Sequence, residues 1–354
     1  MWLYRVYRKK KKLEEKDKEM IVLGVESTAH TFGIGIVQDK EPYILADARR
    51  NYFKEIKEGG IHPREAARYF IEVSDKVLSE ALSQAKISID DVDAIAVALG
   101  PGLGPCLRVG ATIARALAYY YDKPLIPVNH AVAHIEIGLL LTGAKDPVVV
   151  YVAGGNTMII AYNEGRYRVF GETLDLPLGN LQDTFVREIG LAPPYIIEGV
   201  HVIDKCAEGG KFIKGFPYIV KGQDVSFSGL LTAALRYYKS GKARIEDICY
   251  TLREVAYSMV VEVAERAIAH TGKKEILLVG GVAASKTLQE KFKTMAKYHN
   301  AKVMIVSPKY AEDNGTMIAW TGLLAYKHGI TIPIEKAIVR QRWRLDEVDI
   351  IWRH

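Results

Sequence analysis

The sequence contains little cysteine. Its 354 residues include three, Cys106, Cys206 and Cys249, which are widely spaced and form no C-x-x-C pair. An odd number without paired spacing argues against a disulfide framework and against a thiolate zinc site. We therefore expect reduced cysteines and a cytoplasmic location.

Long hydrophobic runs are also missing. No apolar stretch approaches the roughly 18 residues that a membrane span needs. The N-terminal WLYRVYRKKKK places its charges after a short apolar stretch, the reverse of a secretory signal peptide. We expect neither a membrane segment nor export.

A strong excess of charge is absent from most of the chain. The net charge is +6, but residues 1–19 hold eight Lys/Arg and four Asp/Glu, so the remainder carries only +2. Binding of a polyanion would thus depend on local clusters of charge. We interpret residues 1–19 as a flexible basic extension and Met20 as the start of folded structure.

Two nucleotide-binding motifs are lacking as well. The chain contains neither a Walker A sequence nor a convincing G-x-G-x-x-G fingerprint. Their absence argues against a P-loop enzyme and against a dinucleotide-dependent oxidoreductase.

What the chain does contain is an internal repetition. MIVLGVESTAHTFGIGIVQDK reads as a β-hairpin, and the same pattern returns in VVVYVAGGNTMIIAYNEGRYRVFGETLD near residue 148. Helical patterns follow each hairpin. The length suggests about two domains, so the sequence predicts two α/β lobes.

One of these helices has a clear start. Pro63 stands at a plausible first helical position. The apolar stripe expected to face the core runs through Ala67, Phe70, Ile71, Val77 and Leu78.

Glycine-rich turns follow apolar strands in both halves. AIAVALGPGLGPCLRVG and EILLVGGVAASK each end a strand and begin a helix. Free N–H groups at a helix start attract anions, and glycine lets a phosphate approach the backbone closely. A single such turn is equally well explained as a tight connection. Four glycine-bearing turns favour a nucleotide held between two lobes.

Two histidines have metal-ligand spacing. In PVNHAVAHIEIGLL, His130 and His134 stand four residues apart on a predicted helix. Their imidazoles would therefore share one face and could bind one ion. Two hydrogen-bonded core histidines are the alternative. A metalloprotease H-E-x-x-H motif would need Glu where Ala131 stands.

An acidic third ligand is predicted at Asp313. AEDNGTMIAW places Asp-Asn-Gly before an apolar helical run, and such a turn can direct a carboxylate into a cleft. Alternatively, Asp313 or Asn314 only caps that helix.

Taken together, these motifs resemble the Gcp/OSGEP (TsaD-like) family in its archaeal and eukaryotic branch. The resemblance runs from about residue 20 to the C-terminus and includes GGIHPREAA, GPGLGPCLRVG, NHAVAHIEI, AGGNT, KGQDVSFSGLL and EDNGTMIAW. It implies the actin-like ATPase fold, with two duplicated ribonuclease-H-like lobes around a central cleft. We expect lobe I at residues 20–142 and 318–354, and lobe II at 143–317.

The resemblance also implies an activity: transfer of a threonylcarbamoyl group from threonylcarbamoyl-AMP to N6 of adenosine 37 in tRNA. One divalent metal, iron or zinc, would be held by His130, His134 and Asp313, with Tyr151 as a further candidate. No residue is an evident general base. The implied substrate and nucleotide contacts are Tyr151, Val152, Ala153, Gly154, Gly155, Asn156, Asp183, Gly199, Asp204, Gly281 and Ser285.

Several positions depart from the family pattern. Ala153 stands where the family usually has Ser, and Ser285 where it usually has Asn. The loop GLAPPYIIEGVHVIDK is longer by about four residues and has Val200 and His201 at a usual Gly and Pro. These differences lie mainly on the nucleotide side, so we expect altered affinity before altered chemistry.

The implied partners are tRNA and the other KEOPS subunits: a kinase-like ATPase, a dimerisation subunit and an accessory subunit. Two other classes of function remain open on sequence. A metallopeptidase would need a water-activating carboxylate, and Glu136 lies two residues beyond His134, off its face. A nucleotide-gated scaffold would leave the histidine pair unexplained.

Overall fold

A computed structural model describes residues 19–52 and 61–353, which form two compact units. Unit 1 comprises the described residues up to Asn51 together with Pro63–Val128 and Asn314–Gln341. Unit 2 comprises Asn129–Asp313, the segment from Arg342 onward and the described residues between 52 and 62. The expected basic extension lies outside the described residues, apart from Glu19.

Unit 1 is built on a five-stranded sheet ordered β3-β2-β1-β4-β5. The predicted first hairpin is confirmed, because β1 and β2 pair antiparallel, whereas β1 and β4 run parallel. The strands are β1 (Ile21–Glu26), β2 (Thr31–Gln38), β3 (Ile44–Asn51), β4 (Ala94–Gly100) and β5 (Leu125–Asn129).

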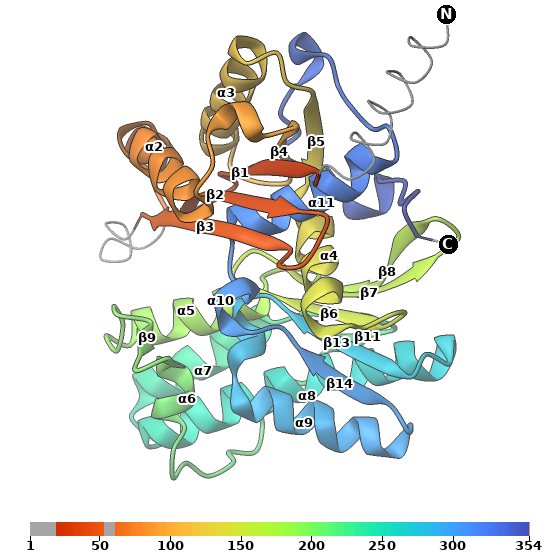
Figure 1. Ribbon diagram of the computed structural model, residues 1–354. Coiled ribbons are helices and arrows are strands. Elements are labelled where there is room, and N and C mark those ends of the chain that lie inside the picture. Colours follow the sequence, from red (N-terminus) through yellow and green to blue (C-terminus); the bar gives the residue numbers. More distant parts are fainter. Residues whose placement is uncertain (1–18, 53–60, 354) are drawn as a thin grey trace, which may run out of the picture. The chain divides into compact units, whose positions relative to one another are not determined.

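Helices α2 and α3 pack against each other and against the sheet of unit 1, and α11 packs against β1 and β2 (Figure 1). Pro63 begins α2 as predicted, but Ile71 is 64% exposed and lies outside the buried stripe. Gly35 allows α11 to lie close to the sheet, since a Cβ there would come within 2.1 Å of the Thr316 nitrogen. The helical segments are α2 (Pro63–Ala85), η2 (Ile89–Asp91), α3 (Gly104–Tyr120), α11 (Gly315–Lys327) and η4 (Ile334–Lys336).

Unit 2 repeats the same sheet. Its order is β14-β13-β6-β7-β8, so three antiparallel strands are again followed by parallel neighbours. This repetition confirms the predicted duplication of an α/β lobe. The strands are β6 (Val148–Val152), β7 (Thr157–Asn163), β8 (Arg166–Glu172), β13 (Glu275–Val279) and β14 (Lys302–Ile305).

The helices of unit 2 enclose a large apolar core, much of it contributed by α8, whose inward face is buried along most of its length. The helical segments are α4 (His130–Thr142), α5 (Leu178–Glu188), α6 (Val202–Cys206), α7 (Ser228–Ser240), α8 (Ile245–Thr271), η3 (Gly281–Ala284), α9 (Lys286–Tyr298), α10 (Pro308–Ala311) and η5 (Leu345–Glu347). Two small hairpins add β9 (Ile196–Ile197) with β10 (Val200–His201), and β11 (Val220–Lys221) with β12 (Asp224–Val225).

The unit boundaries differ from the expected lobe boundaries of 142/143 and 317/318. Helix α4 belongs to unit 2 because it packs against β13, β14 and α10. The C-terminal segment also belongs there, since the Ile350 nitrogen donates to the Gly165 carbonyl and Arg166 pairs with Asp349. Residues 314–317 belong to unit 1, where Gly315 lies against Ile34 and Gly35 of the sheet.

The expectation of reduced cysteines is wrong for one pair. Cys206 on α6 and Cys249 on α8 form a disulfide, and Cys106 is free and buried. The two partners are separated by 43 residues in sequence, so their pairing arises from the packing of α6 on α8. The cysteine count therefore gives no support to a reducing compartment.

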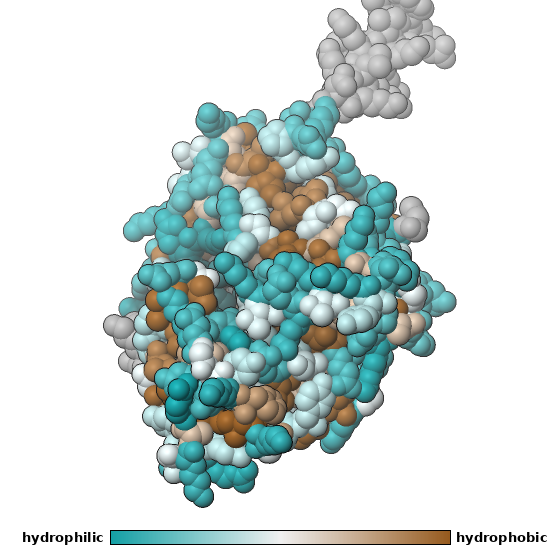
Figure 2. Space-filling view, turned by 90° about the horizontal axis from the view of Figure 1, so that it is seen from below, coloured by the Kyte–Doolittle hydropathy of each residue, from teal (hydrophilic) through white to brown (hydrophobic). Residues whose placement is uncertain are grey.

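Within the described residues, no helix is both long and apolar enough to cross a bilayer. On the face seen in Figure 2, hydrophobic residues form separate patches among hydrophilic ones.

Candidate metal centre and nucleotide-binding turns

Helix α4 positions both histidines. Its N-cap residue Asn129 accepts hydrogen bonds from the backbone nitrogens of Ala131 and Val132 at 3.0 and 3.2 Å, which fixes the first turn. His130 is the first residue of the helix and His134 lies one turn later. Their ring centroids are 4.8 Å apart, with the ring planes nearly perpendicular.

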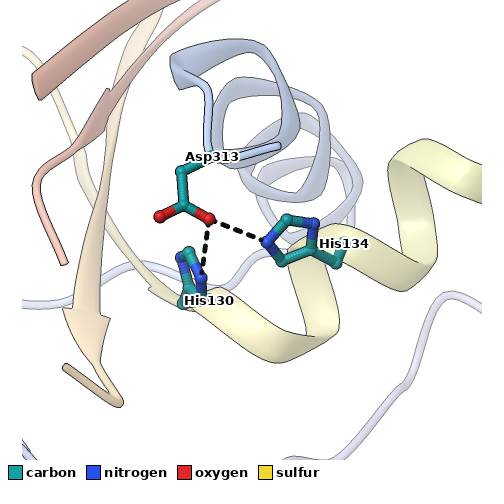
Figure 3. Close-up of side chains that lie close together, drawn as sticks. All are labelled: His130, His134 and Asp313. Atoms are coloured by element: carbon teal, nitrogen blue, oxygen red, sulfur yellow. Dashed lines mark hydrogen bonds and ion pairs between the residues drawn. The ribbon is translucent and has the colours of Figure 1, made fainter. Parts of the chain in front are cut away.

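Asp313 joins the pair from the loop that follows α10. The neighbouring residue supplies the helix cap, because Asn314 Oδ1 accepts from the Met317 nitrogen at 2.9 Å. The Asp313 carboxylate points toward α4 (Figure 3). Its Oδ1 lies 3.4 Å from His130 Nε2 and 3.2 Å from His134 Nε2.

These three groups fit a divalent ion. One ligand atom from each lies within 4.8 Å of the others, and all three side chains are at least 85% buried. Tetrahedral ligands held at about 2.0–2.2 Å from an ion lie roughly 3.3–3.5 Å apart, close to the two distances observed. Two imidazoles and one carboxylate are also a donor set that iron and zinc both accept. The structure thus brings the three predicted ligands together.

Tyr151, the further ligand candidate, lies beside this cluster. Its ring centroid is 5.0 Å from that of His134, and its hydroxyl accepts from Asn156 Nδ2 at 3.4 Å. Tyr151 is buried in β6, so its ring is held in place by the strand. Its role as a ligand remains a prediction.

Glu136 is engaged away from the histidine pair. Tyr167 donates its hydroxyl hydrogen to Glu136 Oε1 at 2.6 Å, and Arg353 Nη1 donates to the same tyrosine oxygen at 2.8 Å. Burial raises the pKa of the Glu136 carboxyl, although the bond from Tyr167 and the charge of Arg353 oppose this. Among the described residues, the carboxylate at the histidines is therefore Asp313.

Two glycine turns leave the sheet of unit 2 at one edge. Strands β6 and β13 are parallel neighbours, with Tyr151 paired to Val279, so the turns after them lie side by side. The first turn, Gly154-Gly155-Asn156, is closed by a 2.8 Å hydrogen bond from the Ala153 nitrogen to the Asn156 carbonyl.

The glycines of these turns fall into two kinds. A Cβ built on Gly154, Gly155 or Gly281 would meet no atom within 4 Å, so space lies open in front of the backbone. Gly280 differs, because its φ is +91° and a Cβ there would come within 2.3 Å of the Val152 carbonyl oxygen. Gly280 is thus required by the fold, whereas the other three leave room for a ligand.

Asp183 and Asp204, the predicted sugar-binding carboxylates, have different surroundings. Asp183 on α5 has a side chain 40% exposed and contacts His201. Asp204 on α6 is 11% exposed, and Arg253 Nη1 lies 3.3 Å from its Oδ1. The sequence did not single out Arg253, because its partner lies 49 residues away on another helix.

The remaining predicted contacts lie in several segments of unit 2. Val152 is buried at the end of β6, and Ala153 is partly buried. Ser285 caps α9 by accepting from the Leu288 nitrogen. Gly199 occupies the tip of the β9–β10 hairpin, where Glu198 and Gly199 both have positive φ. The loop GLAPPYIIEGVHVIDK, which departs from the family pattern, therefore forms this hairpin.

The sequence also did not single out a buried pair, Gln182 and Tyr257. Gln182 Nε2 donates to the Tyr257 hydroxyl at 2.9 Å, joining α5 to α8. Burial and the nearby Asp204 carboxylate raise the pKa of the Tyr257 hydroxyl well above its usual range. Tyr257 is therefore neutral and can act only through hydrogen bonds at ordinary pH.

Comparisons with known proteins point to one family. Residues 44–320 match the family model TsaD, described as tRNA N6-adenosine threonylcarbamoyltransferase. Proteins of that name from Aeropyrum pernix and Hyperthermus butylicus are each 60% identical to this chain; the alignments cover 96% and 95% of the chain and 96% and 93% of the relatives. The protein of that name from Sulfurisphaera tokodaii is 59% identical over 94% of the chain and 99% of its own length.

Solved structures agree on the fold. HypF from T. kodakarensis superposes with a TM-score of 0.62 at 15% identity, covering 88% of this chain and 48% of that one. Component A of (R)-2-hydroxyglutaryl-CoA dehydratase from Acidaminococcus fermentans has a TM-score of 0.52 at 14% identity, covering 87% and 98%. These likenesses and the repeated sheet order confirm the actin-like ATPase fold expected from the sequence.

Proposed function

The chain belongs to the TsaD family of tRNA N6-adenosine threonylcarbamoyltransferases, and from this premise we propose that its unit 2 carries out the acyl transfer with a bound metal. The donor is threonylcarbamoyl-AMP and the acceptor is N6 of adenosine 37 in tRNA. The observation that carries the proposal is the cluster of His130, His134 and Asp313, with carboxylate-to-imidazole distances of 3.4 and 3.2 Å.

The ion held by these residues is iron or zinc. Such an ion, when bound, supplies charge neutralisation at a phosphate and polarisation of a carbonyl oxygen. This suits a site whose described residues include no evident general base beside the histidine pair. In the reaction, a carbon–nitrogen bond forms at the carbamoyl carbon, the carbon–oxygen bond to phosphate breaks, AMP leaves and N6 loses a proton.

The residues of the chain then hold and orient the donor. The open turns at Gly154-Gly155 and Gly281 accept its phosphate and nucleoside, because their backbone N–H groups can be approached without a side chain in the way. Val152, Ala153 and Asn156 flank the phosphate and the acyl group. The carboxylates Asp183 and Asp204, with Gly199 and Ser285 nearby, form the side that receives the sugar and the base.

The metallopeptidase alternative lacks its base. Ala131 stands at the position of the glutamate in H-E-x-x-H, and Glu136 is committed to Tyr167. A scaffold without catalysis would leave unexplained the two buried histidines that face one carboxylate. Acyl transfer uses both the cluster and the glycine turns.

The chain works with partners in this proposal. They are tRNA and the kinase-like ATPase, dimerisation and accessory subunits of the KEOPS complex, all in the cytoplasm. Beyond residues 1–19 the chain carries a charge of only +2, so the partner subunits supply much of the attraction for tRNA phosphates.

The direct test is reconstitution. The metal-loaded chain, its partner subunits, synthetic threonylcarbamoyl-AMP and unmodified tRNA are mixed, and the modified nucleoside is measured by mass spectrometry after digestion. We expect product that depends on the chain and on tRNA. Absence of product with all components present, or proteolysis that depends on His130, would overturn the proposal.

The nucleotide turns have their own test. Gly155→Val places a branched side chain in the open space before the backbone, so we expect the affinity for AMP to fall at least about tenfold while the fold stays intact. Calorimetry measures the affinity. Gly229→Ala on α7 is the control, since its Cβ meets only ordinary contacts beyond 3.5 Å. Equal affinity in Gly155→Val and the unchanged protein would place the nucleotide elsewhere.

A further inference from the structure

His201 has two defined hydrogen bonds in the loop where this chain departs from its family. His201 is the N-cap of α6 and stands where the family resemblance implies a proline. Its Nε2 lies 2.9 Å from Asp183 Oδ1, and the Ile203 nitrogen donates to its Nδ1 at 3.1 Å. A proline could make neither contact.

These bonds fix the form of the imidazole. Because the Ile203 N–H points at Nδ1, that nitrogen must offer its lone pair and carries no hydrogen. The ring hydrogen is therefore on Nε2, which donates it to Asp183. A neutral His201 thus satisfies both partners at once and ties α5 to the first turn of α6.

The two predicted sugar carboxylates are consequently not equivalent. Asp204 is 11% exposed and already faces the guanidinium of Arg253. Asp183 is 40% exposed and uses its Oδ1 in the contact with His201. Among the described residues no donor reaches Asp183 Oδ2, so this oxygen can accept a hydrogen from a ligand hydroxyl.

We propose that His201 is a positioning residue that holds Asp183 for recognition of the ribose hydroxyls of the nucleotide. The inference rests on the proposed function, because it takes an adenosine nucleotide as the ligand of these turns. His201 does not touch the nucleotide in this proposal. It orients the carboxylate that does.

Two substitutions separate this role from helix capping. His201→Asn keeps an oxygen near the position of Nδ1, so it can still cap α6, but it is too short to contact Asp183. His201→Gln places an amide nitrogen near the position of Nε2, so it keeps the Asp183 contact and loses the cap. Glu198→Gln in the same hairpin is the matched control, because it weakens only the exposed pair with Lys205.

The measurement is discrimination between sugars. Calorimetry gives the affinities of the full chain for AMP, 2′-deoxy-AMP and 3′-deoxy-AMP, and thermal unfolding is recorded for each variant. A site that hydrogen-bonds a hydroxyl rejects the analogue lacking it, because its polar group is left unpaired. We expect the unchanged protein to prefer AMP over at least one deoxy analogue, and Asp183→Asn to lose that preference.

His201→Asn should reduce the preference by about five- to tenfold with little change in unfolding temperature. His201→Gln should retain most of the preference and unfold at a lower temperature. Glu198→Gln should match the unchanged protein. Full discrimination in His201→Asn, or its loss in His201→Gln with retention in His201→Asn, would overturn the positioning role.

Failure of the proposed function would give a different result from failure of the positioning role. If the unchanged protein binds none of the three nucleotides, the nucleotide site itself is wrong. If it binds and discriminates but Asp183→Asn does so equally well, the site stands and the assignment to Asp183 and His201 falls.

Discussion

Units 1 and 2 each contain a five-stranded sheet of equivalent order but carry different groups on it. In both, three antiparallel strands are followed by two parallel ones, in the same order. In unit 1, α11 packs closely on the sheet because Gly35 has no side chain and lies against the backbone of Thr316. Unit 2 places polar groups at its sheet edge and on its helices, including His130, His134 and the Asp183–His201 pair.

The comparison shows where the chemistry of a duplicated fold is located. The repeated strands set up equivalent turns, but the candidate functional side chains come from segments that differ between the units. In unit 2 these are α4, the α10–α11 loop and the insertion that forms β9, β10 and α6. Substitutions in these segments of unit 2 should therefore affect function, and substitutions at the close glycine contacts of unit 1 should affect stability.

The largest effect is expected from His134→Ala in unit 2. Loss of this ligand should remove the metal and lower transferase activity by more than about 100-fold, since even an outer-shell partner of a metal typically contributes about 10–100-fold. Elemental analysis and the tRNA assay measure this, with circular dichroism to verify folding. His299→Ala is the control, because His299 pairs with Glu265 on the surface of α8. Full metal content in His134→Ala would place the site elsewhere.

A stability effect is expected from Gly35→Ala in unit 1. The added Cβ would lie 2.1 Å from a backbone nitrogen of α11, so the helix must move away from the sheet. We expect unfolding in denaturant to be easier by about 3 kcal/mol. Gly155→Ala makes the same chemical change in unit 2, where the space is open, and should change stability by less than about 0.5 kcal/mol. Similar midpoints for both variants would show that the two sheets do not differ in this way.

The next effect on stability is expected from the disulfide, which lies in unit 2. Replacing Cys206 and Cys249 together by Ser should destabilise unit 2 by about 2–4 kcal/mol, because the bond closes a loop between residues 43 apart. Reductant should lower the unfolding temperature of the unchanged protein and leave that of the double variant as it is. If reductant affects both equally, the bond contributes nothing to stability.

The smallest effect on stability is expected at Asp175, and this effect should depend on pH. Partial burial alone would raise the pKa of its carboxyl, but hydrogen bonds from Ser226, Ser228 and backbone N–H groups at the start of α7 outweigh this and hold the pKa well below its usual range. Asp175→Asn should destabilise the protein by about 1 kcal/mol at neutral pH, a modest figure because the group is largely exposed.

The direction of this pH dependence follows from the linkage between protonation and folding. A depressed folded-state pKa gives stabilisation that is complete above the unfolded-state pKa of about 3.9 and is lost as the pH falls through the folded-state value. The stability difference between Asp175→Asn and the unchanged protein should thus be constant from pH 5 to 7 and shrink below about pH 4. Asp349→Asn is the control, because it removes a carboxylate from an exposed surface pair with Arg166. A difference that grows on acidification would contradict the assignment.

Much of the fold could be predicted because its signals are local. The hairpins follow from short apolar runs around small-residue turns, and α2 begins at Pro63 as its sequence indicates. The exposed Ile71 shows the limit, since the helical stripe gives the approximate face and the neighbouring elements decide its edges.

Only part of the candidate site could be predicted from local sequence. His130 and His134 share one helix, so their spacing alone places them together. Asp313 was suggested by its turn, and its contact with His134, 179 positions earlier, depends on how α10 packs on α4. Cys206–Cys249, Asp204–Arg253 and Asp183–His201 join different helices or loops, and no spacing rule specifies such partners.

The depth of the metal cluster has a kinetic consequence. His130 and His134 are 5% and 2% exposed, and they lie on a helix whose first nine residues are all buried. We therefore expect an ion bound there to exchange with solution slowly compared with one at an exposed surface site. The metal found in a preparation would then record which ions were present when the chain folded, and brief dialysis against another ion would leave that record unchanged.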